Sequence, residues 1–263
     1  MIENLNAKEE NAGMHRVRTI SVFGLTESGI AEQLTQFKQW FPQFKLGIES
    51  NFPEIRVRLY ASGSETDNLK DSAEAAIEWV CRKLGDHVFS VTGQSMEQAV
   101  GMLLHEKNAT LAVAESCTGG LIANLLTDVP GSSDYFLFSA VTYANQAKMK
   151  ILNVSAETLA RNGAVSEQTA GEMALGAKNI IDATYGLATS GVAGPGGGTD
   201  DKPVGMVCIG LATPSSVSGH RFNFPDRNRR VNKHIFAITA LDLLRKELLA
   251  ANSQATKTLR HEE

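Results

Sequence analysis

The chain has few cysteines, few aromatic residues and no long apolar run. Its 263 residues include 3 cysteines, odd in number and widely spaced, so neither a disulfide framework nor a thiolate metal site is indicated. A reducing, cytoplasmic setting is the simplest interpretation. No segment approaches the roughly 20 apolar residues that a membrane-spanning helix needs. The first 15 residues also lack the apolar core of a secretory signal.

Positive charge is in slight deficit. The 25 Lys and Arg residues are outnumbered by 29 Asp and Glu residues, which gives a net charge of −4. Binding to nucleic acid by neutralising phosphates is therefore not expected. The six histidines are scattered, and none adjoins a glycine or serine motif. The sequence thus indicates neither a Ser-His-Asp triad nor a zinc site, and we expect no metal.

The pattern divides the chain into two domains and two tails. Residues 1–15 and 252–263 are polar and are predicted to be flexible tails. Residues 16–92 change pattern every few residues, which predicts a small α+β domain with no visible catalytic motif. Strands are expected over 17–23, 55–60 and 88–91, and helices over 28–41, with Ser28 as N-cap, and over 69–84, stopping at Gly85.

Residues 93–251 alternate strands and helices, which predicts a layered α/β/α domain. Ser95 and Gln98 have the spacing of a capping box for a first helix, and a last long helix is expected over 228–249. Buried strands are expected over 110–114, 185–190 and 205–212, and a further strand over 136–141. The predicted helix boundaries in between are N-caps at Ser155 and Ser166 and a helix end at Gly163.

The most informative stretch is 114–120, Ala-Glu-Ser-Cys-Thr-Gly-Gly, directly after the apolar run 111–113. Helical spacing of apolar residues begins at Leu121, so the pattern indicates a strand, a tight turn and a helix. This geometry lifts a side chain out of the sheet and points free backbone N–H groups toward it. A nucleophile and an anion site can share such a turn. An ordinary glycine-containing turn fits these seven residues equally well.

Three further segments have the composition of sites. The turn 130–133 offers hydroxyl and N–H donors for a phosphate or carboxylate, although such turns are more often structural. The segment 142–148 follows a predicted strand. The loop 191–199 has five glycines in its first eight positions, a conformational cost that favours close approach of a ligand over simple connection. No Gly-Lys-Ser/Thr follows, so it is not a phosphate-binding loop of the Walker type.

Without a suitable histidine, lysine is the remaining candidate for a base. A free lysine titrates near 10.4, but burial of the ammonium lowers this value, and serine–lysine hydrolases use that effect. Lys148 follows a strand closely and is the candidate, although a solvated helix lysine is the commoner case. Cys117 is the rival nucleophile to Ser116; with no histidine partner it fits a packing role better.

Six separated segments then resemble, in order and spacing, the C-terminal domain of the CinA family, which includes the nicotinamide-nucleotide amidohydrolases. They are 114–120, 130–133, 141–148, 163–167, 190–198 and 202–205. The resemblance covers about residues 95–249, and residues 16–91 resemble the linker domain that precedes this one in full-length CinA. It does not include the molybdopterin-binding-like domain of CinA, so the ADP-ribose pyrophosphatase activity associated with that domain is not expected here.

The resemblance implies deamidation of nicotinamide mononucleotide (NMN) to nicotinate mononucleotide and ammonia, without a cofactor, by a homodimer. It implies Ser116 as nucleophile, Lys148 as general base and Tyr143 as their support, with backbone N–H groups near 118–120 or in the glycine loop holding the oxyanion. The implied substrate-binding residues are Thr118, Gly119, Gly120, Ser133, Ser190, Gly191, Gly194, Gly196 and Arg227. Among them, Ser133 and Arg227 are implied to bind the substrate phosphate or to organise the site. Ser190 stands where the family has Thr or Ser, and Pro225 where it usually has Gly. The alternative is a catalytically silent nucleotide-binding regulator linked to competence or DNA damage.

Overall fold

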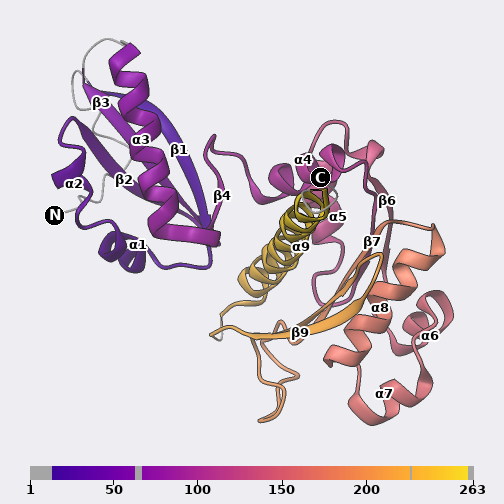
Figure 1. Ribbon diagram of the computed structural model, residues 1–263. Coiled ribbons are helices and arrows are strands. Elements are labelled where there is room, and N and C mark those ends of the chain that lie inside the picture. The colour runs from indigo at the N-terminus through magenta and orange to yellow at the C-terminus, as the bar shows by residue number, and fades with distance from the viewer. Residues whose placement is uncertain (1–13, 63–66, 226, 260–263) are drawn as a thin grey trace. The chain divides into compact units, whose positions relative to one another are not determined.

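The computed structural model describes residues 14–62, 67–225 and 227–259 (Figure 1). The chain divides between Ser95 and Met96 into two compact units, each with its own sheet. Both units mix helices and strands, which confirms the predicted α/β class with a small strand-containing first part. No described helix combines the length and apolar character that crossing a bilayer would need.

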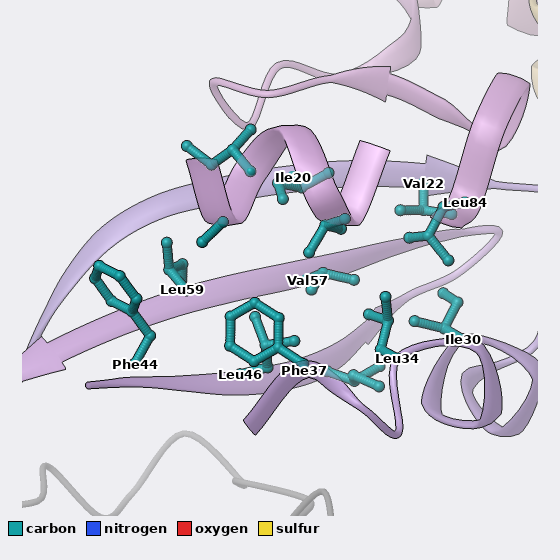
Figure 2. Packing of buried hydrophobic residues seen from close by; sticks show 14 of the residues in the cluster. Ile20, Val22, Ile30, Leu34, Phe37, Phe44, Leu46, Val57, Leu59 and Leu84 are labelled. Atoms are coloured by element: carbon teal, nitrogen blue, oxygen red, sulfur yellow. The ribbon is translucent and has the colours of Figure 1, made fainter. Parts of the chain in front are cut away.

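The first unit is a four-stranded antiparallel sheet covered by helices. In chain order it contains β1 (Met14–Phe23), α1 (Glu27–Gln33), α2 (Phe37–Trp40), β2 (Phe44–Asn51), β3 (Glu54–Ser62), α3 (Asp67–Leu84), a 3-10 turn (Gly85–His87) and β4 (Val88–Ser90). The strand order is β2-β3-β1-β4. Alternate residues of the strands, such as Ile20, Val57 and Leu59, meet Leu34 and Phe37 in one apolar core (Figure 2).

The structure differs from the sequence-based expectation at three places in this unit. Thr26, not Ser28, caps α1, because its hydroxyl accepts the Gly29 N–H at 3.1 Å. The single helix expected over 28–41 is broken into α1 and α2, since the Phe37 N–H bonds the Leu34 carbonyl in a tight turn. Strand β2 was not predicted. The helix α3 ends before Gly85 as expected, and Gly85 has the left-handed φ of +55° that favours glycine.

The second unit is a five-stranded sheet between two helical layers. It contains α4 (Met96–Glu106), β5 (Leu111–Glu115), α5 (Leu121–Thr127), a 3-10 turn (Ser132–Asp134), β6 (Phe136–Val141), α6 (Asn145–Leu152), α7 (Ala156–Asn162), α8 (Glu167–Ile180), β7 (Tyr185–Gly191), β8 (Met206–Ala212), β9 (Val217–Asn223) and α9 (Arg229–Leu259). The order is β6-β5-β7-β8-β9, with β5 parallel to both neighbours and the last pairs antiparallel.

Helices α6, α7 and α8 cover one face of this sheet, and α4, α5 and α9 cover the other (Figure 1). Helix α8 approaches the strands very closely: a Cβ on Gly210 would stand 1.8 Å from the Ala170 carbonyl oxygen. The N-caps at Ser155 and Ser166 and the helix end at Gly163 are confirmed. Helix α9 continues to Leu259, so residues 252–259 are helical rather than the predicted tail. Residues 1–13 and 260–263 lie outside the described residues.

Candidate active site

Ser116 lies in the turn directly after β5, at the carboxyl end of the parallel strands. Its N–H donates to the Thr189 carbonyl at 3.0 Å, which ties the turn to β7. Side chains alternate along a strand, and Ala114 packs in the cluster formed with α6 and α8. Glu115 points the other way, toward α5. Ser116 therefore faces the α6 and α8 layer, and it keeps 9% of its surface exposed.

Lys148 reaches Ser116 from α6. Its Nζ lies 3.1 Å from Ser116 Oγ, 2.7 Å from the Thr142 carbonyl oxygen and 3.2 Å from that of Tyr143. The side chain is only 1% exposed, and no ion pair to it occurs among the described residues. Burial without a counterion lowers the pKa of Lys148 below the usual lysine range.

The three contacts of Lys148 fit a neutral amine that acts as a base. A neutral lysine has two N–H donors and one lone pair in a tetrahedral arrangement. The carbonyls of Thr142 and Tyr143 can each take one N–H, because carbonyl oxygens only accept. The remaining lone pair then faces Ser116 and can accept its hydroxyl proton. The geometry thus places at hydrogen-bond distance from a serine an amine that would be a proton acceptor in its neutral form.

Cys117, the rival candidate for the nucleophile, is a buried side chain. Burial raises the pKa of its thiol to about 12. The thiolate is the nucleophilic form of cysteine, so this shift disfavours Cys117 as the nucleophile. A Cβ on Gly191 would stand 3.2 Å from its Sγ, which is the tight packing expected of a core residue.

Glu115 occupies the amino end of α5. Its carboxylate accepts the N–H groups of Gly120 at 2.9 Å, Ile122 at 3.1 Å and Ala123 at 2.9 Å. The Gly120 N–H is therefore not available to a substrate oxyanion, contrary to the expectation for this residue. The N–H groups of Thr118 and Gly119 have no hydrogen-bond partner among the described residues, so both are donors that the turn leaves available. The Thr118 hydroxyl is itself bonded to that of Thr189 at 2.7 Å.

The first two turns of α9 contribute two cationic side chains to the site, Arg229 and Lys233, which the sequence analysis did not identify. Arg229 donates to the Gly194 carbonyl at 2.7 Å and to the Tyr143 hydroxyl at 3.0 Å. Lys233 Nζ would stand 3.2 Å from a Cβ on Gly119. Arg227, the predicted residue, is exposed and contributes its carbonyl to Asn232. The sequence did contain a signal for Arg229 and Lys233. Basic side chains at the amino end of a helix lie beside the positive end of the helix dipole, which is unfavourable, so their presence there favours an anion as their complement.

The remaining residues that the sequence predicted for the site lie in several different environments. The Ser190 hydroxyl is buried and donates to the Ala164 carbonyl at 2.6 Å. Ser133 is exposed in the 3-10 turn before β6, and within the described part of the chain its hydroxyl bonds neither Ser116 nor Lys148. Gly194 has a left-handed φ of +79°, and a Cβ added to Gly196 would have no atom within 4 Å. Tyr143 touches Lys148 through its carbonyl, while its ring is largely exposed.

Two family models match the chain. Residues 93–248 match the CinA C-terminal domain, and residues 17–90 match the damage-inducible protein CinA KH domain. The chain belongs to the CinA family. KH domains clamp nucleic-acid backbones with a Gly-x-x-Gly loop. Residues 17–90 of this chain contain no Gly-x-x-Gly sequence.

Curated CinA relatives extend the likeness over most of the chain. A CinA-like protein of Desulforapulum autotrophicum is 52% identical over 232 residues, 88% of this chain and 55% of that protein. One from Geobacter metallireducens is 41% identical over 244 residues, 92% of this chain and 59% of that protein. The chain thus spans somewhat over half the length of these CinA relatives.

Solved CinA structures share the fold. The competence/damage inducible protein CihA from Agrobacterium tumefaciens is 39% identical with a TM-score of 0.55, covering 57% of this chain and 91% of that one. A competence-damaged protein (CinA) superfamily protein from Klebsiella pneumoniae is 31% identical with a TM-score of 0.57, covering 60% of this chain and 99% of that one.

No cluster of three or more potential metal-binding His, Cys, Asp or Glu side chains occurs in the described ranges.

Proposed function

We propose that the second unit is a serine–lysine amidohydrolase that converts NMN and water to nicotinate mononucleotide and ammonia. The observation that carries this proposal is the buried, unpaired Lys148 amine, 3.1 Å from Ser116 Oγ. The resemblance of the motifs to nicotinamide-nucleotide amidohydrolases supplies the substrate.

The reaction begins with attack of Ser116 Oγ on the carboxamide carbon while Lys148 takes the hydroxyl proton. The resulting tetrahedral intermediate collapses by breaking the C–N bond, and Lys148 returns the proton to the leaving nitrogen, so ammonia departs. Lys148, neutral again, then takes a proton from water, whose oxygen attacks the acyl carbon. Release of Ser116 Oγ with that proton restores the starting state and yields the carboxylic acid, which loses its remaining proton to the released ammonia or to water and becomes the carboxylate product.

The charge that develops on the carbonyl oxygen needs donors at the serine turn. The N–H groups of Thr118 and Gly119 have the position for this, because they follow Ser116 in the same turn. One well-aimed donor is worth roughly 3 kcal/mol in the transition state. The Lys233 ammonium beside Gly119 would add a positive charge at this point.

The alternative is a nucleotide-binding regulator without turnover, in keeping with the competence and damage terms in the names of the solved relatives. A regulator that only binds has no use for a buried lysine without a counterion, which costs folding free energy. We therefore favour the enzyme. The three cysteines are free, which suits the cytoplasmic location we infer, and a homodimer is our expectation from the family resemblance.

The test is ammonia release from NMN by the purified full chain. Ser116→Ala is expected to lower kcat by more than about a thousandfold because it removes the nucleophile. Lys148→Met is expected to lower kcat by about 10²- to 10⁴-fold because it removes the base. Lys178→Met is the matched control, since Lys178 also donates to a backbone carbonyl but at the far end of α8. A folded wild-type chain that releases no ammonia, or a fully active Ser116→Ala variant, would refute the proposal.

A further inference from the structure

Strand β9 forms one edge of the five-stranded sheet (Figure 1). Among the described strands it pairs only with β8, and the pairing has no register shift. Such an edge presents a row of backbone N–H and C=O groups, which proteins usually protect with proline, a bulge or several charges. The seven residues of β9 include one charged side chain, Arg221, and no proline. This edge therefore keeps the ability to pair with a further strand.

The hydrogen bonds between β8 and β9 show which backbone groups point outward. The Phe224 N–H donates to the Gly205 carbonyl at 2.9 Å, and the Thr213 N–H donates to the Ser216 carbonyl at 2.8 Å. Bonded and non-bonded pairs alternate in an antiparallel ladder, so the even-numbered residues of β9 bond β8. The N–H and C=O groups of the odd-numbered residues, 217 to 223, therefore point away from the sheet. In the described part of the chain, no other segment bonds them.

A groove of about 470 Å³ lies beside the first residues of β9 and the start of α8. Helix α8 packs directly on the strand at this place, because a Cβ on Gly219 would clash with the Glu167 carbonyl oxygen. Val217 also lines the groove, and it is 46% exposed. Gly171 of α8 faces it, since a Cβ there would stand 3.5 Å from Val217 Cγ1. The two glycines leave room beside Val217 for a side chain of an added strand.

The groove is acidic. Its lining contains the carboxylates of Glu167 and Glu172 and no Lys or Arg. Glu167 forms no ion pair in the described ranges. Glu172 accepts the Ser155 N–H and the Thr158 hydroxyl, which are neutral donors and leave its charge uncompensated. The Arg221 guanidinium does not line the groove, because it is bonded to the Asp201 carbonyl. A cationic side chain is therefore the complement of this groove.

We propose that β9 and this groove bind an extended, basic peptide segment of a partner protein, which adds a sixth strand to the sheet. The peptide backbone exchanges hydrogen bonds with the odd-numbered residues of β9, and every second peptide side chain lies over the groove. A lysine or arginine at such a position meets Glu167 and Glu172, and small apolar residues beside it cover Val217. Neither Ser116 nor Lys148 lines the groove, so this binding is separate from the proposed reaction.

The test measures binding of a fluorescein-labelled peptide, Thr-Val-Thr-Lys-Thr-Val-Thr, to the full-length chain by fluorescence anisotropy. The same peptide with Glu in place of Lys is expected to bind at least about tenfold more weakly, because it meets two carboxylates. Methylation of alternate backbone nitrogens should abolish binding in one of the two possible sets and spare the other, because only one set faces β9. Glu167→Gln should weaken binding of the Lys peptide by about three- to tenfold. Glu106→Gln, an exposed acid at the end of α4, is the control and should change nothing.

Amide hydrogen exchange, measured residue by residue by NMR, locates the peptide. In the free chain the amides of the odd-numbered residues of β9 should exchange faster than those of their even-numbered neighbours. Bound peptide should slow the odd-numbered amides by at least about tenfold. Because the peptide analogues act on the unaltered protein, the test does not depend on the folding of a variant.

Equal affinity for the Lys and Glu peptides would overturn the proposal, and so would protection that does not follow the odd-numbered residues. Protection of these amides that rises with protein concentration in the absence of peptide would show that a second copy of the chain occupies the edge. That result, checked by light scattering, would equally overturn the assignment to a partner peptide.

Discussion

Lys148 has its amino group withdrawn from water and held by two carbonyls beside Ser116. Because burial lowers its pKa, the neutral and basic form is reached at lower pH than for an ordinary lysine. We expect kcat/KM for NMN to rise with pH through this lowered pKa and to level off above it. In stability terms, the unfolded chain binds more protons between the lowered and the ordinary pKa, so the free energy of unfolding should rise with pH in that window.

Both effects are checked against Lys148→Met. A pH–rate profile of the wild type and urea unfolding at several pH values for both proteins provide the data. The rise of unfolding free energy with pH in this window should be smaller in the variant. An ascending limb centred at the ordinary lysine pKa would contradict the assignment of Lys148 as the base.

Cys117 offers a second prediction at the scale of one residue. Burial raises the pKa of this thiol to about 12, which disfavours the thiolate at pH 7. Iodoacetamide should therefore label the partly exposed Cys81 well before Cys117, as read by mass spectrometry of peptides. Cys117→Ala should retain ammonia release within a few-fold. Loss of activity as complete as that of Ser116→Ala would reassign the nucleophile.

At the scale of the element, Glu115 fastens α5 to the serine turn. Its buried carboxylate accepts three N–H groups, and replacement by an amide would put an NH₂ group among donors. Glu115→Gln should lower the free energy of unfolding by about 2 kcal/mol and lower kcat with little change in KM. Glu172→Gln is the matched control, because Glu172 also accepts a backbone N–H, that of Ser155, but outside the serine turn. Unchanged kcat in Glu115→Gln would show that the turn keeps its shape without the carboxylate.

Local pattern predicted most elements, because the strand, turn and helix signals lie within a few residues of one another. It marked Ser116 and Lys148 only as separate candidates; their pairing, across 32 positions, came from the family resemblance. The N-caps at Ser155 and Ser166 follow from the same short-range chemistry. Thr26 displaced Ser28 as a cap because two hydroxyls compete for one helix start, and pattern alone does not rank them. Arg229 could not be linked to Tyr143, since only the packed fold brings α9 to the glycine loop. The direction of the Glu115 side chain likewise depends on the placement of α5.

At the scale of the whole molecule, the two units have separate apolar cores. Buried residues of the first core, such as Leu59, all come from residues 20–84, whereas the sheet that presents Ser116 is built from residues 111–223. Cooperative unfolding follows the core to which a side chain belongs. A defect in the first core should therefore leave the chemistry of the second unit intact.

Leu59→Ala tests this separation. Removal of a fully buried leucine side chain should cost the first unit about 2–5 kcal/mol and lower its unfolding transition in calorimetry. The transition of the second unit and kcat for NMN should remain at wild-type values below the first transition. Leu126→Ala, an equally buried position on α5, is the counterpart: it should lower the second transition and the temperature at which ammonia release is lost. A parallel loss of activity in Leu59→Ala would mean that the first unit contributes to the active state of the second.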